Sequence, residues 1–371
     1  MRWSFDGQEY VVELLSKAEA HKVGAETEWW SSYPDFPLHQ RSIWPSVRGP
    51  EAWRMLRIVP SKKQESTICV GLLVNQLRAL PGSLYIRVPK FGVGLDRKMS
   101  TIALAALRHI AWRWKRVVRV RIEVTQLERP EDLELICGRA IQLGYWSQSP
   151  LEYEFTLISP IPYSVEDGAR QFHRSVLKNV RKSVNAGHIV RALTDPRYAE
   201  RMGTLYNETM ERTGAELCAV DMKEVLRSAK NFPESFRVSG LFQRGEGEPE
   251  SLMAFRWCGV SGQFGYDLLA ASTRVEEAGG SIPMMPSIIL DVFSWAHSLG
   301  ARQFDFGGVV HENHPQYSVV GGISRFKLQF GGVVERVGCD LVFEPRPWLA
   351  QLTGLLSRAA KLLNQKKKGS A

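Results

Sequence analysis

The sequence predicts an α/β protein with mixed, α+β-type sheets, built from two domains in tandem. Its 371 residues are enough for two domains that each bury a core. Apolar residues make up 44% and charged residues 23%, the balance of a folded protein and not of a disordered one. Predicted strands and helices alternate in a similar order along both halves. We therefore expect one domain at 1–160, a second at 161–345, and a C-terminal helix and tail at 346–371.

The first domain is predicted to run strand, strand, helix, strand, helix, strand. Apolar periodicity places the strands at 66–80, 82–90, 117–124 and 153–158, and the helices at 99–116 and 130–144. Ser100 is the predicted N-cap of the first helix, and Gly144 ends the second. The two prolines of the segment 159–164 then predict a linker to the second domain.

The second domain repeats this order with different residues. Its predicted elements are helices at 165–187, 197–214, 220–230 and 284–300 and strands at 236–244, 251–260, 262–271, 302–308 and 322–332. The last of these is "GISRFKLQFGG", in which alternation places Phe326, Leu328 and Phe330 on one face and Lys327 on the other. The glycine pairs that bracket it allow positive φ or close approach of another backbone. Lys327 is therefore either half of an ion pair or part of a site.

The cysteine pattern and the charge limit the possible function classes. Five cysteines at positions 69, 137, 218, 258 and 339 lie far apart without a CxxC pair, so we expect reduced thiols and no metal site. The first thirty residues predict neither a signal peptide nor a membrane span. A net charge of +9 predicts a long-range attraction for anions, which include nucleic acid, phosphorylated substrates and acidic membrane surfaces.

Six short motifs follow one another along the chain: "FPLHQRSIWPSV", "LYIRVPKFGVGLD", "FHRSVLKNVRKSVNAGHIV", "YDLLAAS", "ARQFDFGG" and "GISRFKLQFGG". Taken in this order, they resemble the FemABX family of peptidoglycan-bridge aminoacyltransferases and, more widely, the acetyltransferase-like (GNAT) domains. The resemblance covers nearly the whole chain. It implies two tandem GNAT-like domains and a transferase that joins an amino acid from aminoacyl-tRNA to an amine of a peptidoglycan precursor. It also implies that no metal and no bound cofactor take part.

Lys327 is the candidate catalytic residue, and Phe326 is its packing neighbour. Attack of an amine on an ester passes through a tetrahedral oxyanion, which a fixed ammonium group stabilises. The resemblance is equally compatible with a contact between Lys327 and the terminal ribose or phosphate of the tRNA. The structural alternative is an ion pair between Lys327 and Asp305 on adjacent strands.

Four further residues are candidates for binding the substrate: Arg48, Arg212, Tyr266 and Asp305. Arg212 stands where family members bind acceptor phosphates. Arg48 stands near a position where the family uses a lysine, a departure that replaces a point charge with a planar bidentate donor. The alternatives are an ordinary exposed helix face for Arg212 and half-buried packing for Tyr266.

A group of basic residues lies in the predicted helix 165–187: Arg170, Arg174, Lys178, Arg181 and Lys182. No acidic residue lies between Ala169 and Ile189, although exposed helices normally mix charges of both signs. This pattern predicts a phosphate-rich partner, either tRNA or the diphosphate of a phosphorylated, lipid-linked acceptor. The alternative is a solvated helix face.

Two other functions stay open. A CoA-using acetyltransferase presents a glycine-rich turn at a helix N-terminus, and "FGVGLDRKMS" and "VEEAGGSIPMM" match that pattern poorly. The main competing enzyme is an N-acyltransferase that uses an acyl-CoA or acyl-carrier donor in polysaccharide or natural-product biosynthesis. The third possibility is a basic nucleic-acid-binding protein on an inactive transferase fold.

The C-terminal segment 347–368 combines an apolar helical stripe with a lysine cluster. Such a helix either packs on its own domain or contacts an anionic membrane. We expect a cytoplasmic monomer, located at the inner membrane surface in the second case.

Overall fold

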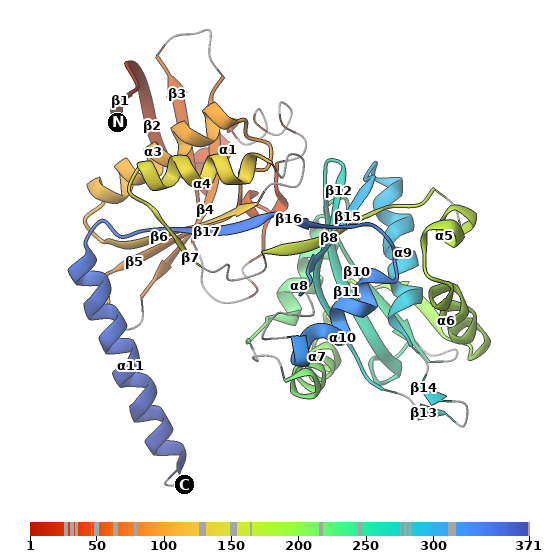
Figure 1. Ribbon diagram of the computed structural model, residues 1–371. Helices are drawn as coiled ribbons and strands as arrows, with labels where there is room; N and C mark the ends of the chain where they lie inside the picture. Colours follow the sequence, from red (N-terminus) through yellow and green to blue (C-terminus); the bar gives the residue numbers. More distant parts are fainter. Residues whose placement is uncertain are drawn as a thin grey trace. The chain divides into compact units, whose positions relative to one another are not determined.

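The computed structural model describes residues 1–25, 29, 33, 36–45, 47, 52–61, 66–77, 80–125, 131–148, 154–163, 165–214, 218–243, 247–274, 276–277, 280–281, 283–310 and 317–369. The chain folds into two compact units, coloured along the sequence in Figure 1. The first contains Met1–Ser42, Pro50–Leu151 and Val337–Ala371, and the second contains Ile43–Gly49 and Glu152–Arg336.

The first unit is built on an eight-stranded mixed sheet. In spatial order its strands are β1 (Arg2–Phe5), β2 (Gln8–Ser16), β3 (Ala52–Pro60), β4 (Ile68–Gln76), β5 (Leu84–Phe91), β6 (Val117–Thr125), β17 (Gly338–Phe343) and β7 (Trp146–Gln148). Its helices are α1 (Lys17–Lys22), the 3₁₀ turn η1 (Leu38–Gln40), α3 (Arg97–Arg113), α4 (Asp132–Gln142) and α11 (Pro347–Gly369). The buried face of α3 is largely alanine and leucine, which lets the helix pack closely on the sheet.

The second unit is built on a seven-stranded mixed sheet. In spatial order its strands are β16 (Val333–Arg336), β8 (Phe155–Pro160), β15 (Gln303–Gly308), β12 (Phe264–Ser272), β11 (Leu252–Ser261), β10 (Phe236–Phe242) and β9 (Ile189–Ala192). A two-stranded hairpin pairs β13 (Glu276–Glu277) with β14 (Gly280–Ser281). The helices are α5 (Val165–Gln171), α6 (Arg174–Asn185), α7 (Ala199–Thr213), α8 (Met222–Asn231), α9 (Met285–Ser298) and α10 (Tyr317–Leu328), with 3₁₀ turns η2 (Pro196–Tyr198) and η3 (Pro249–Ser251).

Both units share one plan. Among the described strands, each sheet contains a single parallel pair, β5 with β6 in the first unit and β12 with β15 in the second. In each case one long helix, α3 or α9, joins the two parallel strands, as a crossover connection requires. Two tandem α/β domains with mixed sheets were predicted, and this architecture confirms them.

The two units divide the chain differently from the two predicted domains. Phe155–Pro160, predicted to close the first domain, pairs with β15 and β16 in the second sheet. Gly338–Phe343, predicted to lie in the second domain, pairs with β6 and β7 in the first sheet. The predicted limits at 160 and 345 followed the chain order, whereas the pairing of β17 with β6 joins residues more than two hundred positions apart in the sequence.

Two local predictions are wrong. The helix α3 begins at Arg97 with Asp96 as its N-cap, whose carboxylate accepts from the Met99 N–H, so Ser100 lies inside the helix. The predicted helix 165–187 consists of two helices separated at Phe172 and His173. The interruption turns Phe172 into the core, where its ring packs against those of Phe293 and Phe330.

The prediction of reduced thiols is wrong for one pair of cysteines. Cys137 on α4 and Cys339 on β17 form a disulfide within the first unit. Their separation of 202 positions in sequence gave no local sign of the pairing. Cys69, Cys218 and Cys258 are free thiols, of which only Cys218 is exposed.

Candidate functional site

Lys327 lies on the helix α10 and not on a strand, so the predicted strand 322–332 is wrong. Its Nζ donates to the Gly308 carbonyl at 2.8 Å, and the residue is half-buried. Phe326 packs edge-on against Phe330, with ring centroids 5.3 Å apart, and joins the hydrophobic core beside α9. Phe326 and Phe330 are four positions apart, and residues at this spacing share a face in a strand and in a helix alike. Alternation alone therefore predicted a strand where the chain forms a helix.

Two glycines turn the chain out of α10. Gly331 and Gly332 have φ of +73° and +103°, which L-residues with a side chain rarely adopt. A Cβ on Gly332 would lie 2.2 Å from the Ile158 carbonyl oxygen, so only glycine fits against β8. The prediction of positive φ and close backbone approach is confirmed for the pair Gly331 and Gly332. This glycine pair fixes the end of the helix that carries Lys327.

Gly308, the acceptor for Lys327, lies where the parallel pair of the second sheet comes apart. The β12–β15 ladder contains three partner pairs and ends at Tyr266 and Asp305. Both strands continue beyond it, β12 to Ser272 and β15 to Gly308, without pairing to each other. Unpaired strand edges expose backbone donors and acceptors to a substrate. The Lys327 ammonium group is thereby held beside this opening.

A buried ion pair flanks the same opening. Arg256 on β11 is only 3% exposed, and its guanidinium grips the Asp267 carboxylate of β12 with both Nε and Nη2, the Nε–Oδ1 distance being 2.9 Å. Its guanidinium carbon lies 5.8 Å from the centre of the Phe306 ring on β15. A bidentate geometry of this kind fixes both side chains. The pair therefore braces β11 against the diverging part of β12.

The surroundings of Lys327 oppose its charge. Burial lowers its pKa from the ordinary 10.5; Asp267 and Asp305 act to raise the pKa, and Arg256 acts to lower it. Within the described part of the chain Lys327 forms no ion pair, so the alternative of a pair with Asp305 is not present. Among the residues that the structure describes, its single hydrogen-bond partner is the neutral Gly308 carbonyl. Such a cation is available to a developing negative charge.

Asp305 and Tyr266 face each other across the last rung of the β12–β15 ladder, and each is 2% exposed. Asp305 accepts from the Thr156 hydroxyl and, at 2.8 Å, from the Gly307 N–H. These bonds hold the turn in β15 that precedes Gly308. Asp305 therefore positions the backbone at Gly308, whose carbonyl accepts the hydrogen bond from Lys327.

Arg212 lies on α7 and reaches the end of β12. Its Nη2 donates to the Ser272 carbonyl at 2.9 Å, and the Thr209 hydroxyl accepts from the Ser272 N–H at 3.1 Å. Partial burial and the neighbouring Arg274 lower the pKa of Arg212. Arg212 and Arg274 thus bring two cations to the C-terminal end of β12.

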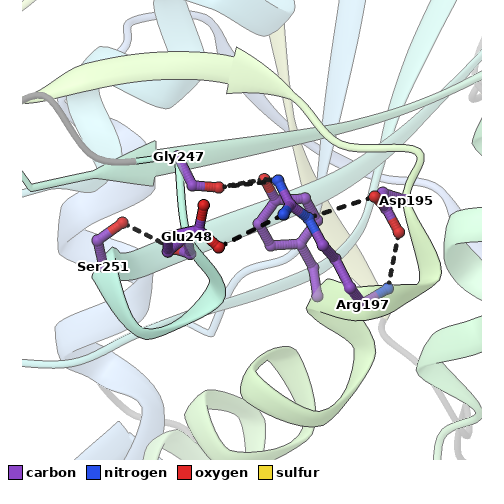
Figure 2. Close-up of polar contacts among 6 residues, drawn as sticks. Asp195, Arg197, Gly247, Glu248 and Ser251 are labelled. Carbon is purple, nitrogen blue, oxygen red and sulfur yellow. Dashed lines mark hydrogen bonds and ion pairs between the residues drawn. The ribbon is translucent and has the colours of Figure 1, made fainter.

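A polar cluster fixes the start of α7 (Figure 2). Arg197 pairs with Asp195 at 3.2 Å and with Glu248 at 3.4 Å, and it donates to the Gly247 carbonyl. The Tyr198 hydroxyl donates to the same carbonyl at 2.6 Å. These contacts tie η2 to the segment before β11, so α7 is anchored at both ends.

The predicted basic group is divided between two helices. Arg170 lies in the last turn of α5, and the other four residues lie on α6. All five are exposed: Arg170, Arg174, Lys178, Arg181 and Lys182. Within the described ranges none of them forms an ion pair, so their charges are not neutralised by nearby acids.

Three further predictions concern Arg48, metal binding and a membrane span. Arg48 lies outside the described residues. Among the residues that are described, no three His, Cys, Asp or Glu side chains gather in a way that would hold a metal ion. No helix in the described ranges is long and apolar enough to cross a membrane.

Comparison with solved structures identifies the architecture. The crystal structure of FemX matches with a TM-score of 0.69 at 14% identity, covering 89% of this chain and 97% of FemX. The chain has the fold of FemX. L-PGS from Bacillus licheniformis matches with a TM-score of 0.53 at 11% identity, covering 90% of this chain and 96% of its own.

A tandem GNAT protein from the clavulanic acid biosynthesis pathway shares the fold as well, with a TM-score of 0.51 at 12% identity and coverage of 90% and 99%. No protein-family model and no curated protein sequence matches the chain. The FemX fold confirms the predicted arrangement of two GNAT-like domains, and it agrees with the resemblance drawn from the motifs.

Within this FemX fold, the sequence reasoning missed Arg256 and Asp267. The signal was an arginine inside the otherwise apolar strand "SLMAFRWCGV" and an aspartate in "YDLL". A charge at a central strand position requires a partner. The antiparallel pairing of β11 and β12 supplies it, because Cys258, two residues from Arg256, stands opposite Asp267.

Proposed function

We propose that the chain is an acyltransferase that forms an amide by moving an amino acid from aminoacyl-tRNA to an amine of a peptidoglycan-type precursor in the cytoplasm. One observation carries the proposal: within the fold of FemX, the Lys327 ammonium group is held at the end of the β12–β15 ladder, and among the described residues its only partner is a neutral carbonyl. A cation at a strand opening suits a reaction that creates negative charge on oxygen.

The reaction needs no covalent enzyme intermediate. The acceptor amine attacks the ester carbonyl carbon of the donor, and the new C–N bond produces a tetrahedral oxyanion. The ester C–O bond then breaks, the ribose oxygen leaves, and the proton lost by the amine goes to that oxygen. Lys327 is proposed to stabilise the oxyanion, a role typically worth about 3–4 kcal/mol. Phe326 holds the helix against the core so that the ammonium group stays in place.

Charges elsewhere in the second unit suit the phosphates of both substrates. We assign the exposed basic residues of α5 and α6 to the tRNA backbone, because none of them forms an ion pair within the described residues. Arg212 and Arg48 are assigned to the acceptor phosphates, with Tyr266 and Asp305 shaping the site. Asp305 acts through the turn that presents Gly308, as its bonds to Thr156 and Gly307 indicate.

A second candidate is an N-acyltransferase that uses an acyl-CoA or acyl-carrier donor in polysaccharide or natural-product biosynthesis. It is favoured by the likeness to a tandem GNAT protein from the clavulanic acid pathway. In the first unit, α3 begins directly after "FGVGLD", and the carboxylate of Asp96 occupies its N-terminus. A carboxylate there competes with an anionic pyrophosphate for the free N–H groups. Aminoacyl-tRNA is therefore our first proposal.

The donor is tested by binding. The purified chain is retained on filters with charged or uncharged tRNA at two salt concentrations, and its thermal unfolding is followed with acetyl-CoA. The proposal expects salt-sensitive retention of charged over uncharged tRNA. Stabilisation by acetyl-CoA alone would establish the second candidate. Equal retention of both tRNA forms, without transfer to any amine, would indicate a nucleic-acid-binding protein on an inactive fold.

A further inference from the structure

The helix α11 presents an unusually apolar surface to solvent. Trp348 is 65% exposed and Leu355 is 63% exposed, and two more leucines, Leu352 and Leu356, are each 39% exposed. The spacing of these residues places them on one side of the helix. The alternative that this stripe packs on its own domain does not hold for the described side chains. Burying such leucines would be strongly favourable, so their exposure calls for a partner.

The helix is attached by its opposite side. Ala350 is 5% exposed and lies roughly 140–160° around the helix from Trp348, Leu352 and Leu355. Just before it, Arg346 donates to the carbonyls of Trp112 at 3.0 Å and Val117 at 3.1 Å. The first turn is therefore fixed to the first unit while the apolar stripe points away from this attachment. The contacts of Arg346 and Ala350 with the first unit therefore set the direction in which the apolar stripe faces.

The charge of the segment selects the partner. No Asp or Glu follows Glu344, whereas Arg358, Lys361 and the three lysines at 366–368 give the helix five positive charges beyond its anchor. A second copy of the helix would bring like charges together, without the opposite charges that flank a paired helix seam. An anionic lipid surface accepts both the apolar stripe and the cations.

We propose that α11 binds in the interface of an anionic membrane. The helix lies along the surface, with Trp348 and the leucines among the acyl chains and the basic residues at the headgroups. Its 23 residues span roughly 34 Å of that surface. Contact of this kind is peripheral, in keeping with the finding that no described helix could cross the bilayer. The proposal goes beyond the proposed reaction and holds for either donor.

The test compares two charge-matched variants of the full-length chain. Leu352→Glu/Leu355→Glu places two acids in the stripe, and Gln351→Glu/Ser357→Glu places two acids at exposed positions outside it. Binding is measured by cosedimentation with vesicles of phosphatidylcholine, with and without phosphatidylglycerol. We expect the wild type to bind only the anionic vesicles. The stripe variant should bind the anionic vesicles at least about a hundredfold more weakly than the charge-matched control. The reason is that it lacks the two leucine side chains whose transfer from water into the membrane favours binding.

Three results would overturn the proposal. The first is equal vesicle affinity of the two variants, which would reduce the interaction to charge alone. The second is a dimer of the wild type, detected by light scattering, that dissociates only in the stripe variant. The third is a lower unfolding midpoint for the stripe variant than for its control, which would show that another part of the chain covers the stripe in solution. Activity is not needed for any of these measurements, so failure of the proposed reaction leaves them interpretable.

Discussion

The two units repeat one plan but treat their parallel strand pair differently. In the first unit β5 and β6 pair from Leu84 with Val117 to Phe91 with Val124, with two irregularities on the way. In the second unit β12 and β15 pair only from Phe264 with Gln303 to Tyr266 with Asp305. The first pair is joined over most of its length, and the second pair is open beyond its third rung.

The charges around the two pairs differ in the same sense. In the first unit Arg87 donates to the Glu123 carboxylate with two nitrogens, and Arg121 pairs with Asp340, so the charges of these four side chains neutralise one another. Beside β12 and β15 the described residues include the ion pair of Arg256 with Asp267, and also Lys327, whose only partner among them is a carbonyl. Closed pairing with matched charges suits a scaffold, whereas an open pair with a spare cation suits a reaction.

The largest expected effect is the loss of stability when a buried arginine is removed from its ion pair. This loss is expected in both units, whereas a loss of activity is expected only in the second. Arg256→Met and Arg121→Met each remove the buried arginine of an ion pair, and breaking a buried pair in this way typically costs about 3–5 kcal/mol of unfolding free energy. Urea denaturation should give similar losses for both. Transfer per folded molecule should fall only for Arg256→Met, since Asp267 borders the open pair.

Two further measurements sharpen that comparison. Arg256→Met/Asp267→Leu removes both charges and should recover most of the lost stability without recovering transfer. A loss of transfer in Arg121→Met equal to that in Arg256→Met would contradict the division of roles between the two units.

The next effect concerns the spare cation. Lys327→Met should lower kcat by roughly 10²–10³-fold, about 3–4 kcal/mol, because the oxyanion loses its donor. Its stability should be unchanged or higher, since a partly desolvated charge is removed. Arg325→Met, an exposed cation two residues away on α10, is the control and should keep its turnover. Normal turnover in a folded Lys327→Met would remove the catalytic role.

The fold was predictable from the sequence because local signals define it. The helices α3 and α9 and the strands beside them have clear apolar periods, so the two crossover units follow from pattern alone. The strand β17 was missed because its neighbours lie in β6 and β7, far away in sequence. The Cys137–Cys339 disulfide depends on the same long-range pairing.

The site was predictable only in part. Lys327 stood out as a cation between apolar residues, but its element was assigned wrongly because Phe326 and Phe330 fit either period. The sequence offered an ion pair with Asp305 as the structural alternative, whereas the Asp305 carboxylate accepts hydrogen bonds from Thr156 and Gly307 within the bulged pairing of β15 with β8. Irregular registers and buried pairs depend on tertiary geometry, which a single sequence does not specify.

A smaller effect tests the glycine that ends α10. Gly332→Ala forces φ of +103° on an L-residue and brings Cβ against the Ile158 carbonyl, so a loss of about 1–3 kcal/mol is expected. Gly138→Ala is the matched change in the first unit, inside α4 with open space around it. It should raise stability by about 0.5–1 kcal/mol. Both are measured by chemical denaturation; a stabilised Gly332→Ala would mean that the turn after α10 is not fixed as described.

The smallest effect is a difference in alkaline pH dependence between the two units. Burial lowers the pKa of Lys327 below 10.5, so between its lowered value and 10.5 the unfolded chain binds more protons and stability rises with pH. Burial raises the pKa of Tyr85 on β5 from 10 to about 12, so in that window the folded chain holds more protons and stability falls with pH. One displaced proton contributes at most about 1.4 kcal/mol per pH unit. Measured from pH 8 upward, at roughly unit steps, the unfolding free energy of the wild type should rise relative to Lys327→Met and fall relative to Tyr85→Phe. Parallel curves for the wild type and Lys327→Met would mean that the ammonium group is as well solvated in the folded chain as in the unfolded one, and the open strand pair would then offer no electrostatic advantage over the closed one.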